Sequence, residues 1–401
     1  MIKILHIGAW GRNYGDRAIQ LTMEDRFMRL FAESHGEVPH FHSMDIQSTD
    51  FRGFDFSPYD LVLVGGGGLL WDKPELESYT GWQWRIPIPD LMDIDPPVAI
   101  YGIGFTKFPY HDPTGSSAMW AHLSATFAKA KHVAVRNSET LALFKAHGID
   151  RVDLIPDPAL FTPVHKAYMV LENGRLVLSP VARKPERFTV GLCWASDKPE
   201  WRFGSIARYN EFMVKFATSL RAFVKARDAQ VLFIEHIKGM DSGARAYFRE
   251  AFGSDNFTSV ELTRPDVYPA SKSKAALFFS VYENCDIVFS ARKHGVWIPA
   301  GKGIPAIGIG GVKEVQWTMN SLGMSPFCLD EYTTGRYSVQ VSADAMLDMK
   351  QEGAYGHRID TLRASLDTFD AEIAASAVNY APIRRERAKQ HSAQYKPEAT
   401  G

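Results

Sequence analysis

The chain has 401 residues, enough for two domains of typical size, and 45% of them are apolar, as in an ordinary soluble globular protein. Its formal net charge of −1 provides neither the basic surface that binds nucleic acid nor an acidic tail. The three cysteines, Cys193, Cys285 and Cys328, are too widely spaced for a disulfide framework or a zinc pattern, which favours a reducing compartment. No apolar run approaches the length of a membrane span.

The N-terminal half alternates short apolar, β-branched runs with helical patterns. The first run is followed at once by polar residues, so we expect a buried strand there and no signal peptide. Gly148 is well placed to end a helix. This alternation predicts a parallel sheet covered by helices on both faces. Strands are predicted at residues 2–7, 61–64, 98–101 and 132–135, and helices at residues 16–34, 116–130 and 138–147.

The pattern pauses at Asp157, and a polar, Pro-containing stretch follows at residues 165–187, where we place the boundary between two domains. It then resumes, so the second half is also α/β. A helical region over residues 343–377 comes next, with Ser342 as its predicted N-cap, and the polar tail from Pro382 onward is expected to fray. Strands are predicted at residues 188–193, 230–235, 259–262, 287–290 and 306–309, and helices at residues 209–227 and 242–252.

Two cations and a histidine, Arg292, Lys293 and His294, follow directly after the apolar strand predicted at residues 287–290. In open α/β sheets, ligands bind just beyond the carboxyl ends of strands. An arginine and a histidine two residues apart at such a point indicate an anionic ligand and a proton transfer. The alternative is a pair of solvated loop cations.

Two glycine-rich segments follow strands in the first half. The first, residues 8–16, contains Asn13 and Asp16 and opens a helix, whose free amides suit an anion, although Asp16 can equally cap that helix. Its spacing matches neither G-x-G-x-x-G nor a Walker A sequence, and a structural turn is the alternative. The second, residues 65–68, has four consecutive glycines, which favours bare backbone against a ligand or a neighbouring domain.

Further polar residues stand at predicted strand ends. Arg136 is a candidate for a bidentate contact with a carboxylate or phosphate, with Ser138 as cap of the next helix, and a structural ion pair with an acid such as Asp157 is the alternative. Glu235 and His236 are candidates for hydroxyl contacts or proton transfer. Because adjacent strand residues point to opposite faces, at most one of the two should face a given site.

In order and spacing, these segments resemble the polysaccharide pyruvyl transferase family from about residue 3 to residue 323. No single motif is specific, but the ordered series is. Two positions depart from the family pattern: Lys293 replaces an apolar residue, and a Gly-Gly-Val sequence precedes Lys313 in place of a Tyr-Asp-x approach. The matching segments are Asn13-x-Gly-Asp16, the glycines at 65–68, Arg136-x-Ser138, Gly148-Ile149, Pro156-Asp-Pro158, Ser290-x-Arg-x-His294, Gly303-x-Pro305 and Lys313.

The resemblance implies a GT-B-like α/β architecture, in which two Rossmann-like domains with parallel sheets face a cleft. Such enzymes transfer the enolpyruvyl unit of phosphoenolpyruvate to a sugar as a ketal, and the high-energy phosphate of this donor makes a metal or redox cofactor unnecessary. The expected domains are residues 1–180 on the acceptor side and 188–342 on the donor side, helices at 343–381 packing back on the first domain, and a flexible tail at 382–401.

The resemblance also implies roles for the site residues. His294 is the expected general acid and base, because a histidine with a pKa near neutrality can deliver and accept protons. Lys293 is expected to point away from the ligand or to mark an unusual acceptor, and Trp71 or Trp82 to offer an aromatic face to a sugar ring. The donor is expected at Arg136, Arg292 and Lys313, and the acceptor at Asn13, Asp16, Gly66, Gly67, Gly68, Glu235 and His236.

Two other classes stay open. A nucleotide-sugar glycosyltransferase of the same architecture would need an acidic residue for a ribose, for which Glu314 is the candidate. A non-catalytic glycan- or anion-binding relative would keep only the scaffold. The expected partners are phosphoenolpyruvate and a saccharide or lipid-linked saccharide, with no nucleic acid. No metal site is predicted, because His35, His40 and His42 match no zinc pattern.

A cytoplasmic protein at the inner face of the membrane is the location that the resemblance implies. Peripheral membrane association and a homo-oligomer are both compatible with the sequence.

Overall fold

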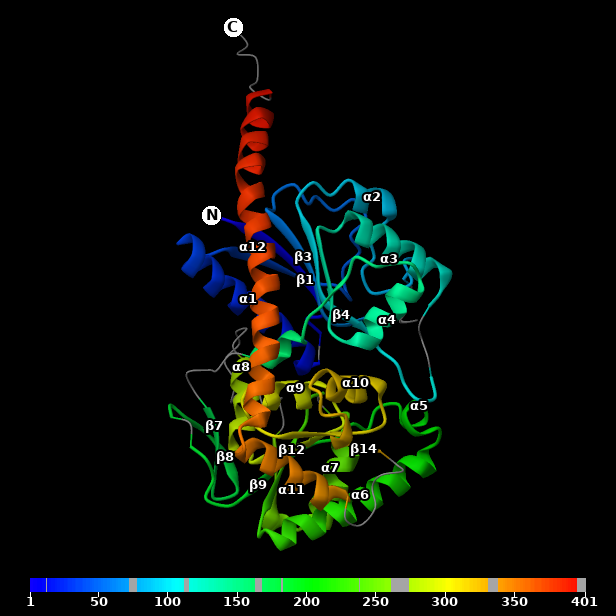
Figure 1. Ribbon diagram of the computed structural model, residues 1–401, viewed down its shortest axis with the longest axis vertical. Coiled ribbons are helices and arrows are strands. Elements are labelled where there is room, and N and C mark those ends of the chain that lie inside the picture. Colours follow the sequence, from blue (N-terminus) through cyan, green and yellow to red (C-terminus); the bar gives the residue numbers. More distant parts are fainter. Residues whose placement is uncertain are drawn as a thin grey trace.

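The computed structural model describes residues 1–11, 13–71, 78–111, 115–162, 168–181, 183–237, 239–260, 274–330 and 338–394. Two α/β domains lie one above the other in Figure 1, with the N-terminal domain in blue to cyan and the C-terminal domain in green to yellow. Each contains a six-stranded parallel sheet, as the alternating pattern predicts.

The first sheet has the strand order β2-β1-β3-β4-β5-β6. Its central strands, β1, β3, β4 and β5, are buried on both faces because alternate residues enter two different cores. Leu61 and Leu63 pack in the core with Phe27 of the first helix, whereas Val62 packs with Phe144 on the other face. The elements are β1 (Lys3–Gly8), α1 (Tyr14–His35), β2 (His40–Asp45), β3 (Leu61–Leu70), α2 (Ile88–Met92), β4 (Val98–Phe105), α3 (Ser117–Lys129), β5 (His132–Val135), α4 (Ser138–Ala146) and β6 (Asp153–Leu154).

The second sheet has the order β11-β10-β9-β12-β13-β14 and is reached through η2 (Pro158–Phe161) and the hairpin β7 (Tyr168–Glu172) and β8 (Arg175–Ser179). Its elements are β9 (Thr189–Cys193), α5 (Pro199–Phe203), α6 (Ile206–Ala226), β10 (Gln230–Ile234), α7 (Ser242–Phe252), β11 (Phe257–Val260), α8 (Lys274–Phe279), η4 (Ser280–Asn284), β12 (Ile287–Ser290), α9 (His294–Gly301), β13 (Ala306–Ile309), α10 (Lys313–Ser321) and β14 (Cys328–Leu329).

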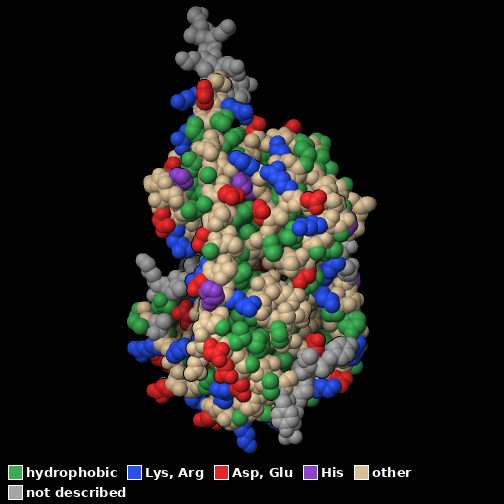
Figure 2. All heavy atoms as spheres, in the orientation of Figure 1, with side chains coloured by type: hydrophobic (Ala, Val, Ile, Leu, Met, Phe, Trp, Pro, Cys, Tyr) green, Lys and Arg blue, Asp and Glu red, His purple; other side chains and the backbone are tan. Residues whose placement is uncertain are grey.

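Two C-terminal helices connect the domains. α11 (Ser338–Gln351) packs on α6 of the second domain, and α12 (Ala354–Gln394) crosses back to α1 of the first. Arg26 of α1 fixes the crossing, because its guanidinium lies 2.7 Å from both Asp367 and Asp370 of α12. Figure 1 shows the end of α12 protruding beyond the first domain, and in Figure 2 Lys and Arg side chains gather around that end.

The structure corrects several predicted boundaries. The hairpin of residues 168–179 belongs with the second domain, not the first, because the amides of Met169 and Leu171 donate to Ser280 and Asn284 of η4, at 3.0 and 2.8 Å. The first domain therefore ends before residue 168 rather than at residue 180.

The C-terminal predictions also change. α11 already begins at Ser338, so Ser342 lies inside it and is no N-cap. α12 continues through Pro382 to Gln394, so residues 382–394 are helical rather than frayed. β3 extends beyond the strand predicted at residues 61–64, continuing through the four glycines to Leu70 in pairing with β4. No helix among the described residues combines the length and apolar character needed to cross a membrane.

Candidate functional site

A cavity of about 820 Å³ lies between the two domains. Most of the residues that line it lie at or beyond the carboxyl ends of β1 to β5 in the first sheet and of β9, β10, β12 and β13 in the second. This is the position at which open α/β sheets bind ligands. We call this cavity the cleft.

One buried carboxylate organises the base of the cleft. Asp157, which is fully buried and begins η2, lies 3.3 Å from Nη1 of Arg136, 3.6 Å from Nζ of Lys293 and 3.8 Å from Nε2 of His294. Arg136 follows β5, whereas Lys293 and His294 follow β12. Three basic groups from both domains therefore converge on a single acid.

Each of the same basic groups has a buried nitrogen without a hydrogen-bond partner. Within the described part of the chain, Nη2 of Arg136, Nζ of Lys293 and Nε2 of His294 are buried and make no hydrogen bond, and neither does Nη1 of Arg202 nearby. Buried donors without acceptors are costly in a folded protein. An anion with several oxygen atoms would satisfy them.

Burial changes the titration of the groups in the cleft. It lowers the pKa of His294 well below its ordinary value, and the positive charge of Arg136 adds to that effect, so the imidazole is neutral at pH 7. The near-neutral pKa expected for His294 is therefore wrong for the protein without a bound ligand. Burial also raises the pKa of Asp157 to about 6 and that of Glu314 to about 7.

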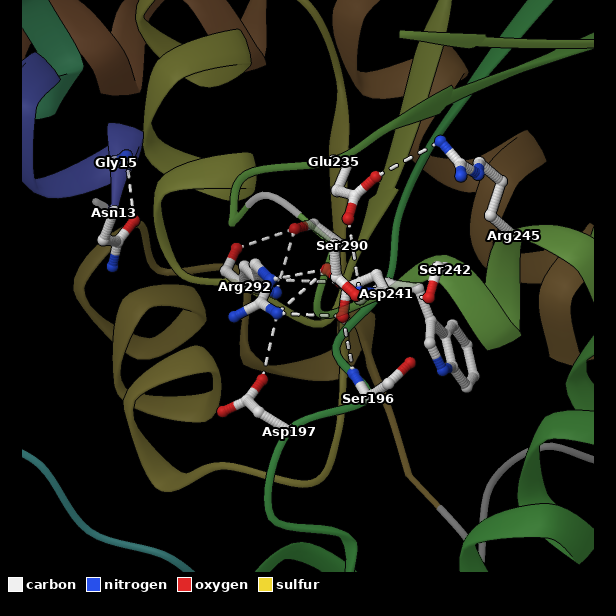
Figure 3. A network of polar contacts seen from close by, with 12 residues as sticks. Asn13, Gly15, Ser196, Asp197, Glu235, Asp241, Ser242, Arg245, Ser290 and Arg292 are labelled. Atoms are coloured by element: carbon white, nitrogen blue, oxygen red, sulfur yellow. Dashed lines mark hydrogen bonds and ion pairs between the residues drawn. The ribbon is translucent and has the colours of Figure 1, made fainter. Parts of the chain in front are cut away.

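Arg292 lines the cleft, but its charge is already paired. Its Nη2 lies 3.0 and 2.9 Å from the two carboxylate oxygens of the buried Asp241 and 2.9 Å from Asp197, and its Nε donates to the carbonyl of Trp194 at 3.1 Å (Figure 3). These contacts hold the loop after β9 against the end of β12. Arg292 is thus placed as an anchor of the cleft wall, not as the free cation expected at the donor.

Lys293 and Lys313 each lie where the sequence did not predict them. Lys293 was expected to point away from the ligand, yet its side chain is only 13% exposed and lines the cleft. Lys313 was expected at the donor, yet it is exposed, lies outside the cleft lining and begins α10. Its neighbour Glu314 is turned inward and is buried in the cleft instead.

The opposite wall of the cleft comes from the first domain and carries neutral amides. Asn13 caps α1 by accepting a hydrogen bond from the amide of Gly15 at 3.0 Å, which corrects Asp16 as the cap. Gln47 donates to Gln83 at 3.0 Å. Asn13, Asp16, Gln47 and Gln83 all line the cleft. Gly15 does not line it, but a glycine is required at this position because a Cβ would overlap the imidazole of His294.

Of the glycines at 65–68, only Gly68 lines the cleft. Gly66, with a φ of 72°, packs against α1, where a Cβ would overlap Ile19, and Gly67 also faces that helix. Three glycines of this segment thus serve the packing of β3 against its neighbours. Gly66 and Gly67, which were predicted to contact the acceptor, therefore do not line the cleft.

Glu235 and His236 separate as adjacent residues should. His236 lines the cleft, where its Nε2 lies 2.6 Å from the hydroxyl of Tyr282 and burial lowers its pKa to about 3. Glu235 is also buried, but it turns away from the cleft to Arg245, 3.6 Å away, and accepts a hydrogen bond from the amide of Asp241 (Figure 3). Glu235 is therefore not brought to the cavity.

Aromatic residues lie at one edge of the cleft. Trp71 and Phe108 line it, and Nζ of Lys198 lies 4.2 Å from the Trp71 ring and 3.9 Å from that of Trp201. Trp82, the other predicted sugar platform, is fully buried and donates to His122, so it is part of the core.

Several cleft residues have no local sequence signal. Gln47 and Gln83 lie in loops far apart in the chain and meet only through the fold. Arg202 follows no strand directly, and Asp157, although part of the Pro156-Asp-Pro158 segment, was given no role beyond a structural ion pair with Arg136. No group of three His, Cys, Asp or Glu side chains that could hold a metal ion occurs in the described ranges.

A family model described as polysaccharide pyruvyl transferase matches residues 10–311. The chain belongs to this family. Its members are transferases of the polysaccharide pyruvyl type, and the resemblance read from the ordered strand-end motifs is confirmed. No curated protein matches the chain in sequence.

Solved structures of other proteins share the fold. A putative UDP-N-acetylglucosamine 2-epimerase from Listeria monocytogenes is 15% identical, with a TM-score of 0.50 over 92% of this chain and 97% of that one. S. aureus MnaA with UDP is 10% identical, with a TM-score of 0.51 over 90% of each chain. A glycosyltransferase from Rickettsia africae is 10% identical, with a TM-score of 0.50 over 93% and 98%. These likenesses concern the fold alone, and they confirm a GT-B-like architecture.

Proposed function

We propose that the cleft binds phosphoenolpyruvate and transfers its enolpyruvyl unit to a saccharide as a pyruvate ketal. One observation carries the proposal: around Asp157, the buried Nη2 of Arg136, Nζ of Lys293 and Nε2 of His294 make no hydrogen bond within the described residues. Phosphoenolpyruvate carries a carboxylate and a phosphate, and both are suited to charge-assisted hydrogen bonds from such groups.

The two cations suit different parts of this donor. The planar guanidinium of Arg136 matches a carboxylate or phosphate edge, whereas the Lys293 ammonium acts as a compact point charge. Arg202 supplies a further buried donor, Nη1. Arg292 supports this donor indirectly. It pairs with Asp197, which in turn pairs with Arg202 at 2.9 Å.

The proposed reaction joins two hydroxyls of the acceptor to one carbon of the donor. The first hydroxyl loses its proton and its oxygen bonds to C2, while a proton is added to the C3 methylene, which becomes a methyl group. The second hydroxyl oxygen then displaces phosphate from C2 and gives up its proton. The products are the ketal and inorganic phosphate, so the reaction balances without a cofactor.

His294 and Glu314 are the groups proposed to move these protons. A neutral imidazole accepts a proton from a hydroxyl and returns it, and a bound dianion beside it would raise the pKa that burial now lowers. Glu314 is buried in the same cleft with one oxygen, Oε2, that has no hydrogen-bond partner in the described chain. Its pKa of about 7 suits proton exchange at neutral pH.

The amide-lined wall is the proposed acceptor side. Asn13, Gln47 and Gln83 offer both donors and acceptors, which is what sugar hydroxyls require. Trp71 adds an aromatic face at the edge of the cleft. We propose a saccharide or lipid-linked saccharide there, in a cytoplasmic enzyme at the inner face of the membrane.

Lys293, which lines the cleft, and Lys313, which lies outside it, provide the test and its control. Thermal stabilisation by phosphoenolpyruvate, and saccharide-dependent release of phosphate from it, are measured for the wild type, Lys293→Met and Lys313→Met. A hydrogen bond to a charged group contributes about 1.5–3 kcal/mol, so Lys293→Met should require roughly ten- to a hundred-fold more phosphoenolpyruvate. Lys313→Met should behave as the wild type.

Three outcomes contradict parts of the proposal. Loss in Lys313→Met with a normal Lys293→Met would show that the donor binds elsewhere. Stabilisation by a UDP-sugar alone would favour a nucleotide-sugar glycosyltransferase. Stabilisation by phosphoenolpyruvate without phosphate release for any saccharide would favour a non-catalytic binding protein.

A further inference from the structure

A second cavity, of about 620 Å³, lies at the opposite end of α9 from His294. The last residue of α9, Gly301, lines it, together with η2 and with side chains from α1, α11 and α12. Among its described lining residues, Glu283 is the one acid. Six cationic side chains face it: Arg29, Arg183, Lys184, Lys302, Lys350 and Arg363. We call this cavity the basic pocket.

Most of these cations have carboxylate partners. The distances are ordinary for ion pairs, but three of the four acids lie outside the pocket lining. The pairs are Arg29 with Asp25 at 3.3 Å, Arg183 with Glu172 at 3.5 Å, Lys184 with Asp286 at 3.2 Å and Lys302 with Glu283 at 2.7 Å.

Lys350 and Arg363 are the two cations without such a partner in the described part of the chain. Arg363 donates to the carbonyl of Gly301 at 2.5 Å, but its Nε is buried and makes no hydrogen bond. Burial and the neighbouring Lys184 lower the pKa of Lys350. The pocket therefore holds an excess of positive charge and open donors.

The end of α9 does not account for this charge. Cations stabilise the carboxyl end of a helix, and Arg363 serves that purpose through Gly301. Lys184 instead contacts Asp286, and Lys350 lies close enough to Lys184 to be destabilised by it. An anion bound in the pocket would reduce the repulsion between these two lysines.

We propose that the basic pocket binds a phosphoryl group, as a site separate from the cleft and independent of the proposed transfer reaction. The pocket has two cations more than it has paired carboxylates, and a phosphate ester carries about 1.5–2 negative charges at neutral pH. The concave shape suits a discrete group rather than a flat membrane surface. The phosphoryl group comes either from a soluble phosphorylated molecule or from a phosphorylated lipid head group.

Inorganic pyrophosphate is the probe for the test. Its binding to the full chain is followed by hydrogen exchange, which separates the pocket (residues 300–304 and 346–353) from the cleft (residues 291–296). We expect protection of the pocket segments in the wild type and its loss in Lys184→Gln/Lys350→Gln. The control Lys215→Gln/Lys225→Gln removes two exposed lysines from α6 and should keep the protection.

Two results would overturn the site. One is unchanged pocket protection in Lys184→Gln/Lys350→Gln, with its fold verified by its thermal melt. The other is protection confined to the cleft segments.

Binding to lipid vesicles distinguishes the two possible sources of the phosphoryl group. Recruitment by vesicles that carry a prenyl diphosphate, lost in Lys184→Gln/Lys350→Gln, assigns the group to a lipid. Binding of pyrophosphate without such recruitment assigns it to a soluble molecule. Equal recruitment by plain phosphatidylglycerol vesicles without pyrophosphate binding would replace the pocket with a general anionic surface, and the proposal would fail.

Discussion

The two ends of α9 carry two cationic cavities that differ in burial. In the cleft, Arg136 and His294 are each 3% exposed and share one carboxylate, Asp157. In the basic pocket, the side chains of Arg183 and Lys184 are 67% and 56% exposed, and each has its own acid. The side chains of Arg136 and His294 are therefore held out of water, whereas the charges of Arg183 and Lys184 remain solvated.

This difference separates what each site can do. A buried charge interacts strongly with its surroundings, so it shifts pKa values and binds a ligand at a fixed geometry. A solvated charge attracts anions over a distance but contributes little per contact. The cleft is built for chemistry, and the basic pocket for binding.

The largest expected effect concerns proton transfer at the buried end. His294→Gln keeps a hydrogen-bonding side chain but cannot exchange protons, so turnover should fall about 10²–10⁴-fold. Thermal stabilisation by phosphoenolpyruvate should persist, because Arg136 and Lys293 remain. Phosphate release under saturating donor measures the loss. Full turnover in this variant would remove His294 from the chemistry and weaken the contrast between the two cavities.

The next effect tests Arg292 as an anchor. Arg292→Met leaves Asp241, which is fully buried, without its counter-charge, and breaking a buried pair costs about 3–5 kcal/mol. The free energy of unfolding in urea measures this. Arg387→Met is the control, because that arginine and its partner Asp95 are both exposed, at 56% and 59%, and exposed ion pairs contribute little to stability. Equal stability of the two variants would show that Arg292 is not a structural cation.

Much of the fold could be predicted from local pattern. The apolar runs that became β1, β9 and β12 are short, β-branched and bounded by polar residues, and such runs have few alternatives to a buried strand. The position of Arg136 and His294 followed from the same pattern, because side chains after parallel strands meet at one edge of a sheet.

The direction of side chains beyond a strand could not be predicted. Lys293 and Lys313 both follow strands, and no periodicity governs the turn that aims one inward and the other outward. Contacts between distant loops, such as Gln47 with Gln83, are likewise a product of the whole fold. Pro382 suggested a helix end, but packing of α12 against the first domain outweighs it: Arg384 contacts Asp60 at 2.6 Å.

A pH-dependent effect follows from Glu314. Burial raises its pKa from 4.5 to about 7, so the folded protein favours the neutral acid. The stability that this provides is fully present below about pH 4.5 and is lost as the pH rises through about 7. Glu314→Gln stays neutral, so it should gain roughly 3 kcal/mol over the wild type across this window, at about 1.4 kcal/mol per pKa unit.

Urea unfolding of both proteins at pH 4 and pH 8 measures the gain. The exposed Glu211 provides the control, since Glu211→Gln should show no gain at either pH. An equal difference between wild type and Glu314→Gln at both pH values would mean that this carboxyl is solvated, and the cleft would then resemble the basic pocket.

The smallest effect is the response of the two cavities to salt. Mobile ions screen the exposed lysines and arginines of the basic pocket, whereas they reach the buried cations of the cleft only when its ligand is absent. Raising the ionic strength should therefore weaken pyrophosphate binding at the pocket segments more than phosphoenolpyruvate binding in the cleft. Hydrogen exchange of the two segments at low and high salt measures both responses. Because both cavities adjoin the same helix, equal salt dependence would mean that burial does not distinguish them and that both bind anions by surface charge alone.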